Sequence, residues 1–102
     1  MTAAWPRMTI QVSGDPGGQE VEILLNPEAR KWLIAALNKL DRADDHFHAF
    51  TFEEWDGLQL SAIPYGPGDT PAVALKVLLR YDDWDAEHFP HVMVRPPDPF
   101  ES

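Results

Sequence analysis

Two short runs near the start of the chain alternate between apolar and polar residues. They are residues 8–12 (MTIQV) and 20–25 (EVEILL), and a glycine-rich turn segment separates them. Alternation of this kind is typical of a strand that buries one face, so the pair predicts an antiparallel hairpin. The apolar face of this hairpin consists of Met8, Ile10, Val12, Val21, Ile23 and Leu25.

The next segment predicts a helix from Pro27 to Leu40. Asn26 can cap the free amides, Pro27 suits the first helical position, and Glu28 favours the positive end of the helix dipole. The apolar residues that follow recur at helical spacing and form one stripe, which consists of Ala29, Leu33, Ala36, Leu37 and Leu40. Because Trp32 lies next to this stripe, we expect it at the edge of the core.

Three more strand-like runs follow the helix. Residues 46–52 are aromatic and alternate with period two, and residues 73–81 make the longest alternating run. Between them, the turn dipeptide Asp56-Gly57 leads into another run at residues 58–63. The order of two strands, one helix and three strands predicts an α+β fold. We expect a two-layer sandwich in which one helix packs on a mostly antiparallel sheet of about five strands.

The pattern is weaker beyond residue 81. Residues 82–87 predict an acidic segment or a short helical turn, and residues 91–95 are a candidate edge strand. The chain of 102 residues has the size of one domain. We assign this α+β domain to residues 1–95, and a proline-rich C-terminal tail follows at residues 96–102. The chain shows no cysteine, no leader pattern and no long apolar run, so we expect a cytoplasmic protein.

Charge is distributed unevenly along the chain. There are 17 acidic and 8 basic residues, for a formal net charge of −9. Residues 1–40 carry four of each sign, whereas residues 41–102 carry thirteen acids and four bases. Such a surface repels nucleic acid, because nucleic-acid binding depends on neutralising phosphates with lysine and arginine. It also disfavours anionic membranes, and it attracts a basic protein partner.

The histidines offer a candidate metal site. His46 and His48 project to the same face of a predicted strand, as paired ligands can. His88 and His91 could complete the site if the C-terminal segment folds across, although the spacing matches no zinc signature. The acids of residues 82–87 could supply paired carboxylates, but consecutive acids usually form a solvated patch. A metal-binding protein or a small metal-dependent enzyme is therefore one functional hypothesis.

Nucleophilic catalysis has little support in the sequence. The serines are Ser13, Ser61 and Ser102, and none lies in a Gly-x-Ser-x-Gly turn. The segment Gly66-Pro67-Gly68 lacks the lysine and hydroxyl residue of a phosphate-binding loop. We therefore favour a protein that is not an enzyme and needs no cofactor.

Several motifs in the middle of the chain occur in a characteristic order. They are Asn26-Pro27-Glu28, Asp45-His46-Phe47-His48, Thr51, Glu54-Trp55-Asp56-Gly57 and Leu60-Ser61. Together with the loop at residues 64–71 and the strand-like run at 73–80, they resemble the small bacterial immunity proteins of immunity family thirty-two. The resemblance extends over residues 8–81. It implies an antitoxin-like protein that binds and neutralises a cognate toxin without catalysis.

Exposed aromatic and acidic residues are the candidate contacts for such a toxin. Trp55 lies at a predicted turn and Trp84 lies within the acidic run, where a core absorbs a tryptophan less easily. Packing against the domain's own flank is the alternative for both side chains. Exposed aromatics often anchor interfaces, and carboxylates suit a basic toxin such as a nuclease. The predicted partner-binding residues are Trp55, Asp56, Asp82, Asp83, Trp84, Asp85 and Glu87.

Self-association through an exposed sheet edge is a third hypothesis. An unpaired edge strand offers free amides and carbonyls to a second chain. Charged edges, however, are also the means by which proteins prevent such pairing. The sequence leaves the oligomeric state open.

Overall fold

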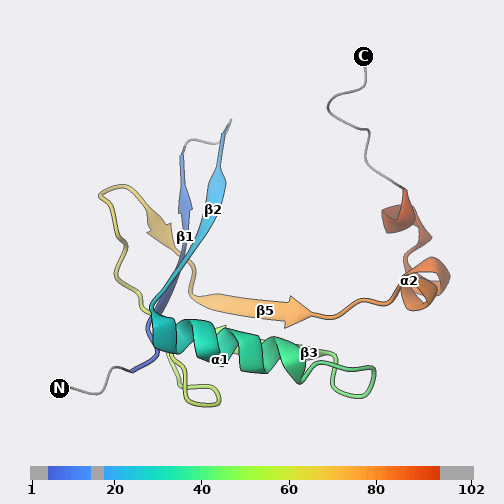
Figure 1. The fold of residues 1–102 in the computed structure, drawn as a ribbon. Coiled ribbons are helices and arrows are strands. Elements are labelled where there is room, and N and C mark those ends of the chain that lie inside the picture. Colours follow the sequence, from blue (N-terminus) through green and yellow to red (C-terminus); the bar gives the residue numbers. More distant parts are fainter. Residues whose placement is uncertain (1–4, 15–17, 95–102) are drawn as a thin grey trace.

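Two antiparallel sheets and two α-helices make up the fold, in a computed structural model that describes residues 5–14 and 18–94 (Figure 1). In chain order the elements are β1 (Met8–Ser13), β2 (Glu20–Leu25), α1 (Pro27–Asn38), β3 (His46–Phe50), β4 (Thr70–Pro71), β5 (Ala74–Leu78), α2 (Asp82–His88) and the 3-10 helix η1 (Pro90–Met93). The fold is therefore α+β, as predicted. The expected tail at residues 96–102 lies outside the described residues.

One sheet has the strand order β2-β1-β4 and the other pairs β3 with β5, with neighbouring strands antiparallel throughout. The predicted hairpin is confirmed, because β1 and β2 pair from Met8 opposite Leu25 to Ser13 opposite Glu20. In the second sheet, His46 lies opposite Leu78 and Phe50 opposite Ala74. Phe47 and Ala49 are buried on its inner face, so the predicted alternation of β3 is also confirmed.

The structure has two sheets where the sequence predicted one sheet of about five strands. The run at residues 58–63 does not form a strand of its own, because its backbone bonds are divided between the two sheets. The Leu60 amide donates to the Phe50 carbonyl at 2.8 Å, and the next amide, of Ser61, donates to the Met8 carbonyl at 2.8 Å. A single parallel bridge between Met8 and Leu60 is all that results on the β1 side.

The expected long strand at residues 73–81 is shorter than predicted. The chain leaves the first sheet after β4 and enters the second at β5, and Ala74–Leu78 is all that forms a strand. At the crossing, the Ala72 amide donates to the Ile10 carbonyl at 2.6 Å, and the Thr51 amide donates to the Val73 carbonyl at 3.0 Å. The two sheets are thus joined through this connection rather than through continuous pairing.

The core forms where α1 meets the bases of both sheets. Its buried cluster consists of Met8, Ile10, Ala29, Ala49, Leu58 and Leu60. Trp32 and Leu33 of α1 are partly buried and pack against this cluster, so the expected position of Trp32 at the core edge is confirmed. Val21 and Ile23, predicted on the buried face, are 67% and 50% exposed. The end of the hairpin extends past the helix (Figure 1), which leaves these two side chains without a covering layer.

The helix α1 begins where its sequence predicts. Asn26 is the N-cap residue, and its side-chain oxygen accepts a hydrogen bond from the Ala29 amide at 2.9 Å. Pro27 occupies the first turn, and Glu28 places an acid at the positive end of the dipole. The helix ends at Asn38 rather than Leu40. The Lys39 amide is shared between the carbonyls of Ala35 and Ala36, at 3.2 and 3.3 Å, which is typical of the tightened last turn of a helix.

The C-terminal part of the described chain is helical. The predicted helical turn in the acidic run is helix α2, and none of its residues is buried. The prediction of an edge strand at residues 91–95 is wrong for its described part, residues 91–94, because Pro90 opens the 3-10 helix η1 and the Val92 amide donates to the Phe89 carbonyl at 3.0 Å. In the part of the chain that the structure describes, neither helix has the length and apolarity needed to cross a bilayer.

Candidate functional site

A tight turn after β3 presents Trp55 and Asp56. Trp55 and Leu58 exchange both backbone hydrogen bonds, at 2.8 and 3.0 Å, so the loop between them has two residues. Asp56 and Gly57 both have positive φ angles, of +50° and +88°. This is the mirror-image turn that Asp-Gly favours, and the prediction of a turn here is confirmed. The turn projects Trp55 away from the core, with 40% of the residue exposed.

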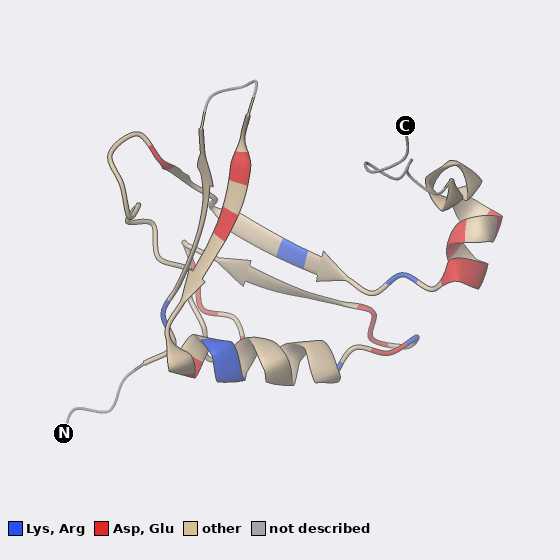
Figure 2. Ribbon diagram, turned by 45° about the horizontal axis from the view of Figure 1, so that its top comes forward, with Lys and Arg blue, Asp and Glu red and all other residues tan. Residues whose placement is uncertain are grey.

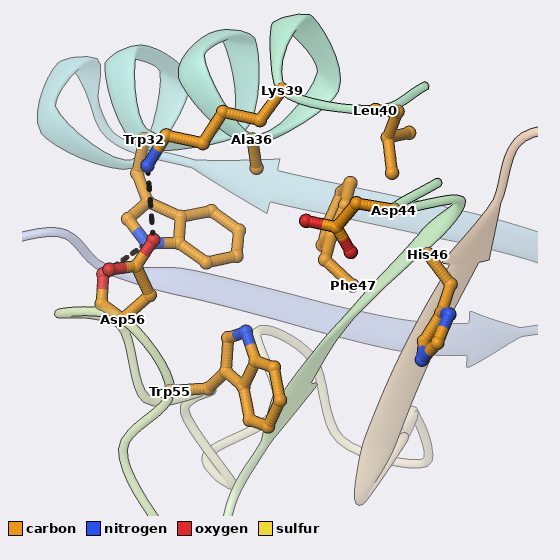
Figure 3. A pocket seen from close by; sticks show the side chains of 9 residues that line it. All are labelled: Trp32, Ala36, Lys39, Leu40, Asp44, His46, Phe47, Trp55 and Asp56. Atoms are coloured by element: carbon orange, nitrogen blue, oxygen red, sulfur yellow. Dashed lines mark hydrogen bonds and ion pairs between the residues drawn. The ribbon is translucent and has the colours of Figure 1, made fainter. Parts of the chain in front are cut away.

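A hollow of about 440 Å³ lies between α1, β3 and this turn (Figure 3). Its size falls within the range of roughly 300–1,000 Å³ that is typical of small-ligand sites. Trp55 and Asp56, two of the predicted partner-binding residues, line it together with residues of α1, of β3 and of the loop between them. The lining residues are Trp32, Ala36, Lys39, Leu40, Asp44, His46, Phe47, Trp55 and Asp56.

Trp32 ties the turn to the helix on one side of this hollow. Its indole Nε1–H donates to the Asp56 carbonyl at 2.7 Å, which holds the turn against α1. The Trp32 ring meets the Phe47 ring edge to face, with centroids 5.6 Å apart. On the same side, the Lys39 Nζ lies 3.5 Å from Asp56 Oδ2, in an exposed ion pair. The wall is therefore both aromatic and charged.

The loop between α1 and β3 brings a further carboxylate to the hollow. Asp41 Oδ1 accepts hydrogen bonds from the amides of Ala43 and Asp44, at 2.9 and 2.7 Å, and the Asp41 amide donates to the Asp44 carbonyl at 3.0 Å. This small turn fixes the backbone at Asp44, and the Asp44 carboxylate points into the hollow in Figure 3. Asp44 was not among the site residues predicted from the sequence. Its signal was the acidic run after the helix, but only the fold shows which of these acids points inward.

His46 and His48 lie on the same face of β3, as predicted, and belong to a row of aromatic rings. The two imidazole centroids are 5.1 Å apart, and His48 stacks on Phe50 at 5.4 Å and meets Trp55 at 5.2 Å. Residues 5–14 and 18–94 contain no group of three or more His, Asp or Glu placed to hold a metal ion. His88 instead lies against Trp84, with ring centroids 4.4 Å apart.

The other predicted contact residues lie on α2. Asp83 forms a two-pronged ion pair with Arg42, with nitrogen–oxygen distances of 3.0 and 3.2 Å. These hydrogen bonds lower the pKa of Asp83 below its ordinary value. Trp84 is 38% exposed and stacks under the Arg80 guanidinium, whose Cζ lies 4.7 Å from the ring centroid. Asp82 and Glu87 are exposed and Asp85 is half-buried.

The predicted site thus falls into two groups. Trp55 and Asp56 follow β3, which ends at Phe50. Helix α2 follows β5, whose last residue, Leu78, lies opposite His46 at the start of β3. The two groups therefore lie at opposite ends of the β3–β5 sheet. The acidic α1–β3 loop is near both groups, because Asp44 lines the hollow while Arg42 binds Asp83 on α2. Figure 2 shows the acids of this loop and those of α2 at the same end of the sheet.

In comparisons with known proteins, no family model, curated protein or solved structure matches the chain.

Proposed function

We propose that this chain is a non-catalytic immunity protein that binds and neutralises a bacterial protein toxin through an acidic surface. The single observation that carries the proposal is the concentration of charge, with thirteen acids against four bases in residues 41–102. The resemblance of the sequence to immunity family thirty-two supports the choice of a toxin as the binding partner. As part of the same proposal, the chain acts in the cytoplasm, as expected from its sequence.

The charge distribution favours a basic target. A nuclease that binds phosphate presents lysine and arginine around its active site. An inhibitor with the opposite charge is steered toward that surface and associates faster than a neutral one, with a rate that falls as salt increases. Here the acids of α2 and of the α1–β3 loop are mostly solvent-exposed, so they can act at long range on an approaching partner.

Two of the exposed tryptophans, Trp55 and Trp84, supply anchors for the bound state. Trp55 and Trp84 are 40% and 38% exposed and belong to different ends of the β3–β5 sheet. Buried aromatic anchors dominate the energetics of many protein interfaces and mainly set the dissociation rate. In this proposal the acids set how fast the toxin is captured, and the tryptophans set how long it stays bound.

The experiment that tests the proposal is capture of the partner from lysate of the native organism. The tagged chain is used at low and high salt, and bound proteins are identified by mass spectrometry. We expect one stoichiometric basic protein whose capture is weaker at high salt and whose toxicity the chain suppresses. Capture of no such protein, from cells in which toxin expression has been verified, would contradict the proposal.

Charge reversal then tests the role of α2 with the captured partner. Asp82→Lys and Asp85→Lys each change the charge by two while leaving the Arg42–Asp83 ion pair in place. We expect each to slow association severalfold and to weaken its dependence on salt. Glu20→Lys makes the same change of charge on the exposed start of β2, at the far end of the hairpin, and is the matched control. Equal association rates for all three variants would remove α2 from the interface.

A further inference from the structure

We propose that the hollow between α1, β3 and the Trp55 turn is a receptor for one arginine side chain of the basic partner. The inference rests on the proposed function, because it names the chemical group that the acidic surface would capture. It concerns a different region from α2, and it can be tested without the partner. Two features of the hollow support it: its aromatic walls and its carboxylates. Together they favour a planar cation such as the guanidinium group of arginine.

The aromatic walls offer faces and edges on which a cation can rest. Trp32, Phe47 and Trp55 line the hollow from three elements: the helix, the strand and the turn. Figure 3 shows the Trp55 ring on the side opposite α1, with the open space between them. A guanidinium or ammonium within about 6 Å of such rings is attracted by their electron-rich faces, tryptophan most strongly.

The carboxylates make the hollow selective for positive charge. Asp44 and Asp56 both line it, and Lys39, which carries the only lysine or arginine side chain among the lining residues, is paired with Asp56 at 3.5 Å. Among the described residues, no lysine, arginine or histidine forms an ion pair with the Asp44 carboxylate. Asp44 is therefore the acceptor that a guest cation would use, and the Asp41 turn fixes its backbone beside the hollow.

Arginine fits this combination better than lysine. A guanidinium is planar, so it can lie on an aromatic face while its N–H groups form two parallel hydrogen bonds to one carboxylate. It is also less strongly hydrated than an ammonium, which reduces the cost of entering an aromatic hollow. The same chain already uses this pairing, since Arg42 binds Asp83 through two nitrogens and lies 3.8 Å from the centroid of the Tyr81 ring.

The test uses two small probes with the full chain. N-acetyl-arginine amide carries the proposed group, and N-acetyl-citrulline amide has the same shape without the charge. Binding is followed by NMR through the indole N–H signals of Trp32 and Trp55. We expect the arginine probe to shift both signals saturably at millimolar concentration, and the citrulline probe to bind about fivefold or more weakly, as the loss of a cation–π contact and an ion pair implies.

Two variants localise the effect. Asp44→Asn keeps the shape of an exposed side chain and should weaken the arginine probe about fivefold. Glu20→Gln removes the same charge on the exposed start of β2, outside the hollow, and should leave the affinity for the probe unchanged. Trp55→Leu, checked for folding by its NMR spectrum, should weaken the probe through loss of the aromatic wall. Equal binding of both probes, or of the arginine probe to the wild type and to Asp44→Asn, would overturn the inference.

Failure of this inference is distinguishable from failure of the proposed function. If a basic partner is captured but Asp44→Asn binds it as tightly as the wild type does, the hollow is not the arginine receptor and the proposed function stands. If the arginine probe binds at the hollow but the lysate yields no basic partner, the chemistry of the hollow stands and the immunity function does not.

Discussion

At the scale of single residues, Arg42 connects the body of the protein to its acidic helix. It lies in the α1–β3 loop, binds Asp83 of α2 through two nitrogens and stacks 3.8 Å from the centroid of the Tyr81 ring. These contacts raise the pKa of Arg42 and lower that of Asp83, in both cases chiefly through the hydrogen bonds between the two side chains. Since α2 has no buried residue, this pair is a main link between α2 and the rest of the chain.

The pair makes a prediction about pH. Because the pKa of Asp83 is lowered in the folded state, the ion pair is fully present above the ordinary aspartate value of about 3.9 and is lost as the pH falls through the lower, folded value. Carbon-13 NMR of the Asp83 carboxyl should show this low midpoint, and Arg42→Gln should raise it toward about 3.9.

Asp45 is the internal control in the same titration. Its pKa is lowered mainly by the hydrogen bond with His46 Nδ1, at 3.0 Å, so Arg42→Gln should leave it in place. A midpoint for Asp83 that does not respond to Arg42→Gln would show that the ion pair does not form in solution.

At the scale of elements, the start of α1 organises the base of the hairpin as well as the helix. The Asn26 side-chain oxygen accepts from the amides of Ala29 and Arg7, at 2.9 and 3.0 Å, and its nitrogen donates to the Trp5 carbonyl at 2.8 Å. The Asn26 amide also donates to the Arg7 carbonyl at 3.1 Å. One side chain therefore caps the helix and holds the segment that enters β1.

We expect Asn26→Ala to lower the free energy of unfolding by about 1–2 kcal/mol, which is the upper part of the range for loss of an N-cap. The matched variant Asn26→Asp keeps the oxygen that accepts from Ala29 and Arg7, so it should retain most of the stability. Urea unfolding followed by tryptophan fluorescence measures both. Equal stability of the alanine variant and the wild type would mean that the cap contributes little to this helix.

At the scale of the whole molecule, the chain is more extended than a compact domain. Its radius of gyration is 16.8 Å and its principal dimensions are 50 × 38 × 24 Å, whereas a compact domain of this length has a radius of gyration of about 13 Å. Figure 1 shows two causes: the hairpin of β1 and β2 extends away from α1, and α2 lies apart from the core at the end of the β3–β5 sheet. Both leave apolar surface exposed, including Val21, Ile23 and Trp84.

This shape predicts unequal local stability. A seven-residue helix without buried side chains is only marginally stable by itself, so α2 should open without unfolding the core. In hydrogen exchange by NMR, we expect the amides of α2 to exchange much faster than the paired amides of β1. Binding of the partner should slow exchange in α2. Protection of α2 equal to that of β1 in the free protein would contradict this prediction.

Much of the local structure follows from the sequence, because its causes are local. The cap at Asn26, the positive φ angles at Asp56 and Gly57 and the alternation in β3 depend on residues within a few positions of one another. In the candidate site, Trp55, Asp56 and the acidic run of α2 could be predicted from the sequence. The grouping of Asp44 and Trp32 with Trp55 and Asp56 could not, since the hollow exists only where three separate elements meet.

The sequence by itself determined the hairpin, the helix start, the turn and the excess of acidic charge, while the tertiary structure alone decided how the strands are divided and what is covered. Gln11 shows the difference. Its polar position in β1 predicts a solvent-facing side chain, yet it is 2% exposed. Its amide group is satisfied by Glu22, Asp69 and the amide of Tyr65, at 3.0–3.1 Å. Two of these partners come from a distant loop, and a buried polar group is stable only when such partners are in place. No local pattern specifies contacts between segments so far apart, because they form only when the whole chain folds.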